Sequence, residues 1–168
     1  MPQNKAQNIK NSCGSWAAAV LLVAIMVCLG ACSPEHTSYS DFSDLPDEGW
    51  DAGTPIYLTP QYGDSTMHYD VTLAVRNTNL YKFDNLILTV DLISASGTVT
   101  RNRVVYTITD AYGNFQGSGF GAYYQSRALI AHGVSPAQVK RIAVWPRMKG
   151  VKLITGLTNI GIIVSPTK

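Results

Sequence analysis

Cysteine is scarce in this sequence, and its scarcity limits the chemistry that the chain can perform. Of the 168 residues, only Cys13, Cys28 and Cys32 are cysteines. The first two lie in an N-terminal segment that we expect to be removed, and we expect Cys32 to carry lipid. The remaining chain would then hold no disulfide, no thiolate metal site and no cysteine nucleophile. Its stability must come from a hydrophobic core, for which a chain of this size suffices.

The sequence also lacks a hydrophobic run long enough to cross a membrane. The apolar stretch 16–29 has about 14 residues, whereas a spanning helix needs about 20. Lys5 and Lys10 precede this stretch, and the tetrad Leu-Gly-Ala-Cys follows it and ends at Cys32. A basic region, an apolar region and small residues form the layout of an export signal. Because the tetrad resembles a lipobox, we predict a lipoprotein signal peptide over residues 1–31. An ordinary secretory signal is the alternative.

Acidic side chains are absent from the last third of the chain. All 11 lie between Glu35 and Asp110, whereas residues 111–168 hold seven Lys and Arg side chains. Once Lys5 and Lys10 leave with the signal, 11 cations balance 11 anions. This balance argues against a nucleic-acid partner. We expect basic and acidic strands to interleave in the fold, and a basic binding face is the alternative.

No group of residues has the spacing of a catalytic or metal site. His68 and Asp70 share one face of a predicted strand, but two ligands do not make a metal site. The glycine-rich run 117–121 lacks the first glycine of a nucleophile elbow, because Gln116 stands in its place. We expect a glycine-rich strand there instead. The sequence therefore predicts no enzyme activity, no metal and no cofactor.

The segment that follows the lipidated cysteine has the composition of a linker. Residues 32–49 are rich in Ser, Pro and acidic side chains and contain few branched apolar residues. We therefore expect a tether between the lipid and the domain. Tyr39, Phe42 and Leu45 fall three residues apart, so they could dock part of this tether on the domain. The domain itself is predicted over residues 50–168.

From residue 50 onward, apolar and polar residues alternate in short segments that are separated by turn signals. Such an alternation places the apolar residues of each segment on one face of a β-strand. The segments lie at residues 69–75, 86–92, 104–108, 142–144 and 160–164. They predict an all-β fold, namely an antiparallel β-sandwich, with jelly-roll connections as one option. Residues 135–138, Ser-Pro-Ala-Gln, are the single hint of a helix in this domain.

Arg76 is the most unusual polar position in this pattern. It follows the strand at 69–75, on the face opposite the apolar residues, and Asn77 and a predicted turn come next. A guanidinium there can bind a carboxylate, such as that of Asp91, together with turn carbonyls, which Lys cannot copy. We therefore expect Arg76 and Asn77 to matter more for stability than for chemistry. The alternative is that Arg76 contacts a ligand or a partner on an exposed face.

The chain resembles the gliding motility lipoprotein H family of the Bacteroidota from about residue 50 to its end. The landmarks are Trp50, Arg76-Asn77, the segment 110–117, Arg147-Met148 and the segment 156–161. The sequence departs from the family pattern at Lys82-Phe83, Phe115 and Pro146. The resemblance implies a lipoprotein of the gliding machinery and its linked secretion system, without known catalytic activity. It marks four structural or interaction residues: Trp50, Arg76, Asn77 and Arg147.

These features predict a lipid-anchored envelope protein with a non-enzymatic structural or assembly role. The lipid on Cys32 would attach the protein to the membrane, and other envelope proteins would be its partners. Ser33 is not the Asp that retains many lipoproteins at the inner membrane, so we expect the outer membrane. The segment 33–36 lacks the clustered acids of a surface-export signal, which favours the periplasmic face. The alternative function is a carbohydrate-binding module that uses exposed aromatic side chains.

Overall fold

The computed structural model describes residues 39–167, and this part of the chain forms β-strands and no helix. The strands are β1 (Tyr39–Asp44), β2 (Trp50–Asp51), β3 (Ile56–Leu58), β4 (Tyr69–Thr78), β5 (Asn85–Ile93), β6 (Val99–Thr107), β7 (Ser118–Phe120), β8 (Tyr123–Val134), β9 (Arg141–Pro146), β10 (Leu153–Ile154) and β11 (Leu157–Pro166). The predicted all-β fold is thus confirmed. It follows that the described residues offer no helix able to cross a bilayer.

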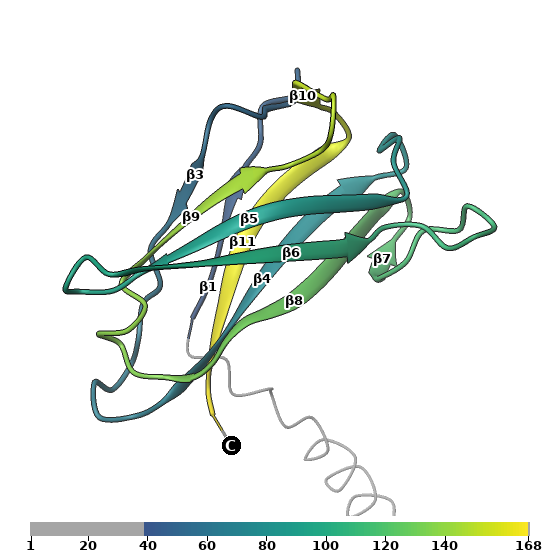
Figure 1. Ribbon diagram of the computed structural model, residues 1–168. Helices are drawn as coiled ribbons and strands as arrows, with labels where there is room; N and C mark the ends of the chain where they lie inside the picture. The colour runs from purple at the N-terminus through teal and green to yellow at the C-terminus, as the bar shows by residue number, and fades with distance from the viewer. Residues whose placement is uncertain (1–38, 168) are drawn as a thin grey trace, which may run out of the picture. The chain divides into compact units, whose positions relative to one another are not determined.

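Two large sheets face each other and form a sandwich (Figure 1). The five-stranded sheet has the order β1-β11-β4-β8-β7, and the four-stranded sheet has the order β3-β9-β5-β6. Strands β10 and β2 form a separate two-stranded ribbon. The antiparallel pairs β1–β11, β3–β9, β4–β8 and β5–β6 are nested around the β5–β6 connection. Nested pairs that alternate between two four-stranded layers, with β7 added at one edge, make the jelly roll that the sequence left as an option.

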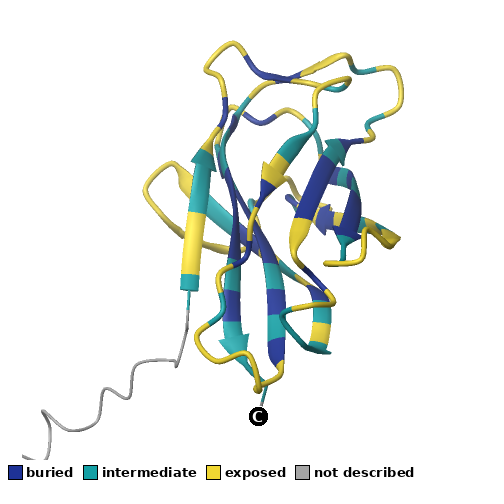
Figure 2. Ribbon diagram, turned by 90° about the vertical axis from the view of Figure 1, so that its left-hand side faces the viewer, coloured by how far each residue is buried: buried dark blue, intermediate teal, exposed yellow. Residues whose placement is uncertain are grey.

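The hydrophobic core fills the space between the two sheets. Tyr69, Val71, Leu73 and Val75 of β4 are buried on one face, as their alternation predicts. The same holds for Leu86, Leu88, Val90 and Leu92 of β5. Figure 2 shows the buried positions along the strands and the exposed ones mainly in the loops. Each square ångström of apolar surface that is removed from water contributes about 25 cal/mol, so these facing rows hold the layers together.

One buried tyrosine also joins the two layers by a hydrogen bond. The Tyr106 hydroxyl of β6 donates to the Leu73 carbonyl of β4, with an oxygen–oxygen distance of 2.8 Å. Burial raises the pKa of the Tyr106 phenol, so the hydroxyl keeps its proton and remains a donor. The bond lies near the open edge of the sandwich, where β6 and β8 approach each other.

The longest strand, β8, is one that the alternation pattern does not predict as a whole. It pairs with β4 along its length, but the register shifts on either side of Val71. Gly133 adopts a positive φ of 59°, and its N–H donates to the Asp70 carboxylate at 2.9 Å. These irregularities break the period of two, and the exposed side chains of β8 include the apolar Leu129. An apolar residue on the outer face hides the pattern on which the prediction depends.

The predicted tether over residues 32–49 extends too far, because its second half is part of the sandwich. Strand β1 pairs antiparallel with β11, from Tyr39 opposite Val164 to Asp44 opposite Asn159. Leu45 is buried, and its N–H donates to a backbone carbonyl at 2.8 Å. The expected docking of Tyr39, Phe42 and Leu45 therefore occurs, as an edge strand. The predicted signal peptide and Cys32 lie outside the described residues.

The segment 135–138 is a turn and not the start of a helix. The Gln138 N–H donates to the Ser135 carbonyl at 3.0 Å, and the Gln138 side-chain oxygen accepts from the Ser135 N–H at 2.7 Å. The capping pattern is present, but Val139 is then buried in the core and β9 begins at Arg141. Burial of Val139 and pairing of β9 limit the segment to a single turn, because tertiary contacts override local propensity.

Candidate functional site

Two of the residues that the sequence singles out, Trp50 and Asn77, lie in the interior. The Trp50 indole N–H donates to the Thr54 carbonyl at 2.8 Å, so this buried ring closes a turn. The Asn77 amide is fully buried, and its Nδ2 donates to the Thr78 carbonyl at 3.1 Å. Its Oδ1 has no hydrogen-bond partner among the described residues. Neither side chain can contact a partner molecule without a rearrangement of the fold.

The other two, Arg76 and Arg147, lie on different sheets and do not form one site. Arg76 belongs to β4 of the five-stranded sheet, whereas Arg147 follows β9 of the four-stranded sheet. Arg147 donates from Nη1 to the Pro146 carbonyl at 3.2 Å. Because each sheet turns its inner face to the core, these two side chains open onto two separate surfaces.

Arg76 is held by an aromatic ring and by a neutral amide. Its guanidinium carbon lies 3.9 Å from the centre of the Phe42 ring. Its Nε donates to the Gln125 side-chain oxygen at 2.9 Å. The carboxylate partner that we predicted, Asp91, lies in the other sheet and binds Arg101 instead. That part of the prediction is wrong, because Asp91 and Arg76 stand on strands of opposite layers.

A glycine allows the Phe42 ring to reach Arg76. Phe42 stands opposite Gly161 of β11, and Gly161 stands opposite Ala74 of β4. A Cβ atom at Gly161 would lie 2.6 Å from two ring carbons of Phe42 and still closer to the Asp41 carbonyl oxygen. Gly161 and Ala74 therefore leave space above β11, and the Phe42 ring extends across it toward Arg76 on β4.

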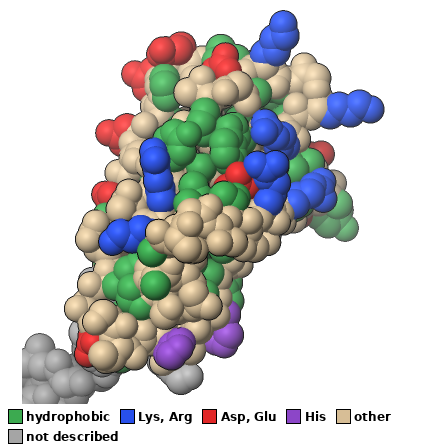
Figure 3. All heavy atoms as spheres, turned by 60° about the vertical axis from the view of Figure 1, so that its left-hand side comes forward, with side chains coloured by type: hydrophobic (Ala, Val, Ile, Leu, Met, Phe, Trp, Pro, Cys, Tyr) green, Lys and Arg blue, Asp and Glu red, His purple; other side chains and the backbone are tan. Residues whose placement is uncertain are grey.

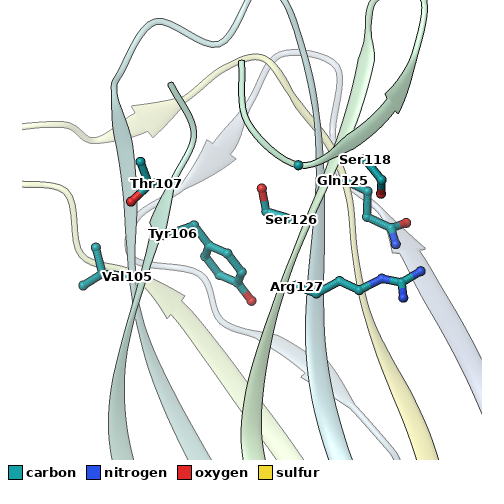
Figure 4. A pocket seen from close by; sticks show the side chains of 8 residues that line it. Val105, Tyr106, Thr107, Ser118, Gln125, Ser126 and Arg127 are labelled. Carbon is teal, nitrogen blue, oxygen red and sulfur yellow. The ribbon is translucent and has the colours of Figure 1, made fainter. Parts of the chain in front are cut away.

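A shallow pocket of about 370 Å³ opens beside Arg76 on the outer face of the five-stranded sheet. We call it the Arg76 pocket, and its lining includes Arg76, Ser118, Phe120, Tyr123, Gln125 and Arg127. Figure 4 shows Ser118, Gln125 and Arg127 extending to the same side of β8. The exposed fraction is 92% for Phe120 and 61% for Tyr123, so two aromatic rings stand in water at this hairpin.

A second groove of about 550 Å³ continues from the Arg76 pocket around the open edge of the sandwich. It runs between β6 and β8, and Val105 and Thr107 line one side of it. In Figure 4, Ser126 lies on the other side of β8 from Arg127, toward the Tyr106 ring. The groove and the pocket share Ser118, Gln125 and Arg127, so they form one continuous depression.

The glycine-rich run next to this depression is a short strand, as predicted. Strand β7 pairs Ser118 with Gln125 and Phe120 with Tyr123. A Cβ atom at Gly119 would lie 2.5 Å from the Tyr123 carbonyl oxygen. Glycine is needed here because the two backbones approach closely, and not because the run holds a nucleophile or a phosphate.

The outer face of the four-stranded sheet collects four arginines. We call this surface the arginine face, and its cations are Arg101, Arg103, Arg141 and Arg147. The register of β5 places Asp91 opposite Arg101, Thr89 opposite Arg103 and Ile93 opposite Arg141. Because β5 runs between β6 and β9, their outward side chains share one surface. In Figure 3, Lys and Arg side chains surround a hydrophobic patch, whereas many acidic side chains lie along the left margin.

One carboxylate, Asp91, lies within the arginine face and is buried there. It accepts two hydrogen bonds from Arg101, at 2.6 Å and 2.7 Å. The Arg101 hydrogen bond holds the pKa of Asp91 below its usual range, and the charge of Arg147 acts in the same direction. Asp91 and Arg101 both precede residue 111, so this pair does not bear on the expected interleaving of the acidic and basic segments. The pairing of β5 with β9 does, because it sets a strand of the acidic segment beside a strand of the basic one. The other arginines of the face have no carboxylate within ion-pair distance among residues 39–167.

Aromatic rings accompany the arginines on this face. The Arg141 guanidinium lies 3.9 Å from the centre of the Tyr57 ring, and that of Arg147 lies 6.0 Å from the Trp145 ring. Val99 and Val105 are about half exposed on the same side of β6. Arginine and aromatic side chains are the types enriched at protein interfaces. Sequence alternation could place Arg101 and Arg103 together, but it gives no means to add Arg141 and Arg147.

No cluster of metal-binding side chains occurs in the part of the chain that the structure describes. No group of three His, Cys, Asp or Glu side chains comes together within it. His132 and Asp70 form a pair with an Nδ1–oxygen distance of 2.8 Å. Burial opposes ionisation of Asp70, but hydrogen bonds from Gly133 and Thr167 outweigh it and lower its pKa. The pair lies at the end of the β4–β8 ladder where Tyr69 stands opposite Val134.

Comparison with known proteins identifies the family of the chain. The family described as GldH lipoprotein matches residues 37–164. The chain is 24% identical over 159 residues to the gliding motility lipoprotein GldH of Flavobacterium johnsoniae, which covers 91% of this chain and 94% of that protein. It is 22% identical over 153 residues to a gliding motility lipoprotein GldH homolog of Christiangramia forsetii, with coverage of 86% and 93%.

Solved structures show a weaker likeness. The Tobacco streak virus coat protein matches with a TM-score of 0.34 and 10% identity, covering 83% of this chain and 93% of the coat protein. The VP2 protein of infectious bursal disease virus matches with a TM-score of 0.32 and 14% identity, covering 77% of this chain and 30% of that protein. The family match spans nearly the whole described region, including β1, which composition alone had assigned to a tether. The chain belongs to the GldH lipoprotein family.

Proposed function

We propose that this chain is a lipid-anchored, non-enzymatic assembly component of the cell envelope that takes part in gliding motility and its linked secretion system. Two relatives that are aligned over most of their length are named gliding motility lipoproteins, which supports this role. The arrangement of side chains supports the non-enzymatic part of the proposal. The side chains of the arginine face and of the Arg76 pocket are mainly arginines, amides, hydroxyls and aromatic rings, which suit binding more than acid–base chemistry.

The arginine face carries the assembly proposal. Three of its cations have no carboxylate within ion-pair distance among the described residues, and exposed valines and rings lie between them. A surface of this kind complements an acidic protein surface with apolar patches, because guanidinium groups form paired hydrogen bonds with carboxylates. We infer that an acidic envelope protein docks on the outer face of β9, β5 and β6.

The membrane attachment is part of the same proposal. Cys32 would carry the lipid, and Ser33 beside it favours the outer membrane. Since each buried acyl CH₂ contributes about 0.8 kcal/mol, a doubly acylated cysteine holds the protein on the membrane without a protein contact. Cys32→Ser should release the chain from washed membranes, and protease added to intact cells should leave a periplasmic protein uncut.

Site-specific cross-linking of this chain in the cells that make it tests the docking surface. A photo-reactive residue replaces Val99 on the arginine face or Leu80 in the loop after β4; both side chains are exposed. We expect a protein adduct from position 99 and none from position 80. The double variant Arg103→Glu/Arg141→Glu should abolish the adduct, whereas Lys82→Glu/Lys152→Glu, with the same change in charge, should retain it. An adduct that survives reversal of the arginine face would contradict this docking surface.

Carbohydrate binding is a second candidate function, and the Arg76 pocket is the observation that favours it. Phe120 and Tyr123 expose flat rings beside a polar depression. Exposed rings next to hydrogen-bonding side chains are suited to a sugar, because one face of a pyranose is apolar and its hydroxyl groups are polar. Binding of an oligosaccharide by wild type, and its loss in Phe120→Ala, would test this candidate.

A further inference from the structure

The guanidinium of Arg76 is fixed in place while its charge remains available. The Phe42 ring covers one of its faces, and Gln125 accepts a hydrogen bond from Nε. None of the described residues accepts a hydrogen bond from its two terminal nitrogens. An arginine that is held by its Nε edge and by its flat face loses little freedom when a ligand binds. Its terminal N–H groups can then pair with both oxygens of a carboxylate.

The carboxylate that comes nearest in register to Arg76 is already engaged. Asp44 of β1 stands opposite Asn159 of β11, and Asn159 stands opposite Arg76. The Asn159 side-chain amide donates to the Asp44 carboxylate across this row. Asp44 is thus held on β1 with β11 between it and Arg76, so it does not neutralise the guanidinium by direct contact.

The rest of the Arg76 pocket adds donors and no acid. Because Gln125 uses its side-chain oxygen to accept from Arg76, its amide nitrogen is left as a donor. Arg127 lies two residues farther along β8 and brings a second positive charge to the lining. Ser118 of β7 stands beside Gln125 in the ladder and contributes a hydroxyl to the lining. Since no Asp or Glu lines the pocket, it is suited to an anionic ligand that carries several acceptors.

The aromatic rings of Phe120 and Tyr123 at the rim indicate which kind of molecule carries the anionic group. Phe120 and Tyr123 face each other across the β7–β8 hairpin and stand far out in water. The pocket beneath them is shallow, so a ligand there would lie along the surface and not insert a side chain. A sugar ring can stack its C–H face on such a platform while its hydroxyl groups meet Ser118 and Gln125.

We propose that the Arg76 pocket binds a glycan that carries a carboxylate, with a uronic acid as the simplest case. Arg76 receives the carboxylate, Arg127 adds electrostatic attraction, and Phe120 and Tyr123 support the sugar ring. This inference deepens the carbohydrate-binding candidate and is independent of the assembly role. The pocket lies on the five-stranded sheet, so it and the arginine face could be occupied at the same time.

Calorimetric titration of the full chain in detergent micelles tests the proposal. The probe is trigalacturonic acid, and its fully methyl-esterified form is the uncharged control of the same shape. We expect the acid to bind at least about tenfold more tightly than the ester, which corresponds to about 1.4 kcal/mol. Arg127→Ala and Phe120→Ala should each weaken binding of the acid by about fivefold or more. Arg103→Ala on the other sheet and Tyr112→Ala in an exposed loop are the matched controls and should leave it unchanged.

The possible outcomes distinguish an acidic-glycan site from a neutral carbohydrate site and from a general anion site. Equal binding of acid and ester that still depends on Phe120 would overturn the carboxylate and keep a neutral carbohydrate site. If inorganic phosphate or a short acidic peptide competes as effectively as the free uronate does, that result would overturn the claim that the ligand is a glycan. No binding of the acid at about 10 mM would overturn the acidic-glycan site, and no binding of the ester either would overturn the carbohydrate candidate as well. Arg76→Lys, verified by its melting curve to be folded, should bind the acid more weakly although it keeps the charge.

Discussion

The two outer faces of the sandwich hold their arginines in opposite ways. On the four-stranded sheet, Arg101 binds the buried carboxylate of Asp91 with two short hydrogen bonds. On the five-stranded sheet, Arg76 is held by the Phe42 ring and by the neutral Gln125. The first arrangement consumes the charge of the arginine, whereas the second fixes the side chain and leaves its charge uncompensated. The type of residue alone therefore does not tell which arginine serves the fold and which can serve a ligand.

The same difference separates the two surfaces as interaction sites. Asp91 stabilises the fold only while Arg101 or another donor satisfies it, because an unpaired buried carboxylate is costly. Arg103, Arg141 and Arg147 around it remain free for a broad acidic partner. Arg76 stands in a small pocket and is suited to one anionic group. Substitutions at four positions test this comparison, and the positions are taken in order of the effect that we expect on folding.

Gly161→Val should lower the free energy of unfolding most, because it fills the space above β11 through which Phe42 reaches Arg76. The new side chain would collide with the Asp41 carbonyl and with the Phe42 ring, so β1 must shift from β11. Overpacking of this kind costs about 3 kcal/mol. Urea denaturation with fluorescence detection measures the loss. Gly63→Val is the matched control, because a Cβ atom at Gly63 meets only the Tyr69 hydroxyl, at 3.7 Å. Equal midpoints for the two variants would contradict the tight approach of β1.

Arg76→Lys should be the next largest, at about 2 kcal/mol. An ammonium group can neither stack as a flat plate on Phe42 nor reproduce the Nε hydrogen bond to Gln125. Arg76→Ala should lose about the same amount, since the charge itself has no carboxylate partner to lose. Thermal unfolding by circular dichroism measures both. Arg103→Lys on the exposed arginine face should change stability by less than about 0.5 kcal/mol. A wild-type melting curve for Arg76→Lys would show that Phe42 and Gln125 do not depend on the guanidinium.

The Asp91 carboxyl should give a smaller effect that depends on pH. Its folded-state pKa is lowered, first by the hydrogen bond from Arg101, so its ionised form stabilises the fold. This stabilisation is present above the unfolded pKa of about 4 and is lost as pH falls through the lowered folded value. The difference in unfolding free energy between wild type and Asp91→Asn should therefore reach its full value at neutral pH and vanish in acid. The Arg101 side chain is 69% exposed, so water screens the pair and the effect stays below that of Arg76→Lys.

Urea midpoints of wild type and Asp91→Asn at a series of pH values measure that difference. The same comparison in an Arg101→Gln background serves as the control, because the hydrogen bond that lowers the pKa is then gone. The pH-dependent part should shrink markedly in that background. An unchanged dependence would mean that Arg101 is not its cause.

The sequence predicts the core of this fold well and its edges poorly. Alternation locates β4 and β5 because their inner residues are all apolar, and it fixes the face on which each side chain lies. Strand β8 is hidden by the register shifts at Val71 and by Gly133, which interrupt the period of two. Strand β1 is hidden because it lies at an edge, where Ser and Asp positions face water. Edge strands commonly carry such polar residues, which resemble those of a linker.

The candidate sites are missed for a related reason. Arg76 is singled out by its position at the end of a strand, but Phe42 and Gln125 come from the two strands that alternation does not find. The arginine face joins β6 with β9 through β5, and a single sequence carries no record of that pairing order. The composition shows that cations are concentrated after Asp110, yet Arg101 and Arg103 of the same surface come before it. The order of strands in the sheet, and not the distribution of charge along the chain, decides which arginines come together on one surface.

Asn77→Leu should show the smallest effect on stability, although Asn77 neighbours Arg76 and is fully buried. Its Nδ2 donates only to the Thr78 carbonyl, and that carbonyl also accepts from the Tyr81 N–H at 3.2 Å. Its Oδ1 is buried without a partner among the described residues, which is itself a cost. Asn77→Leu would remove this unpaired oxygen and leave the Thr78 carbonyl satisfied. We therefore expect the free energy of unfolding to change by less than about 1 kcal/mol in either direction.

Asn77→Asp is the informative counterpart, because it keeps the shape of the side chain and adds a charge that nothing there can pair. Strand register places Tyr124 and Leu157 on either side of this position, and no described residue donates a hydrogen bond to the Asn77 side-chain oxygen. Burial of an unpaired carboxylate is costly, so Asn77→Asp should unfold at clearly lower urea than Asn77→Leu at neutral pH, and the gap should narrow in acid as the carboxyl gains a proton. If Asn77→Leu were instead as damaging as Asn77→Asp, the amide would have to be a specific hydrogen-bonding element of the β4 end, and Arg76 would no longer be the one residue of the pair on which that end depends.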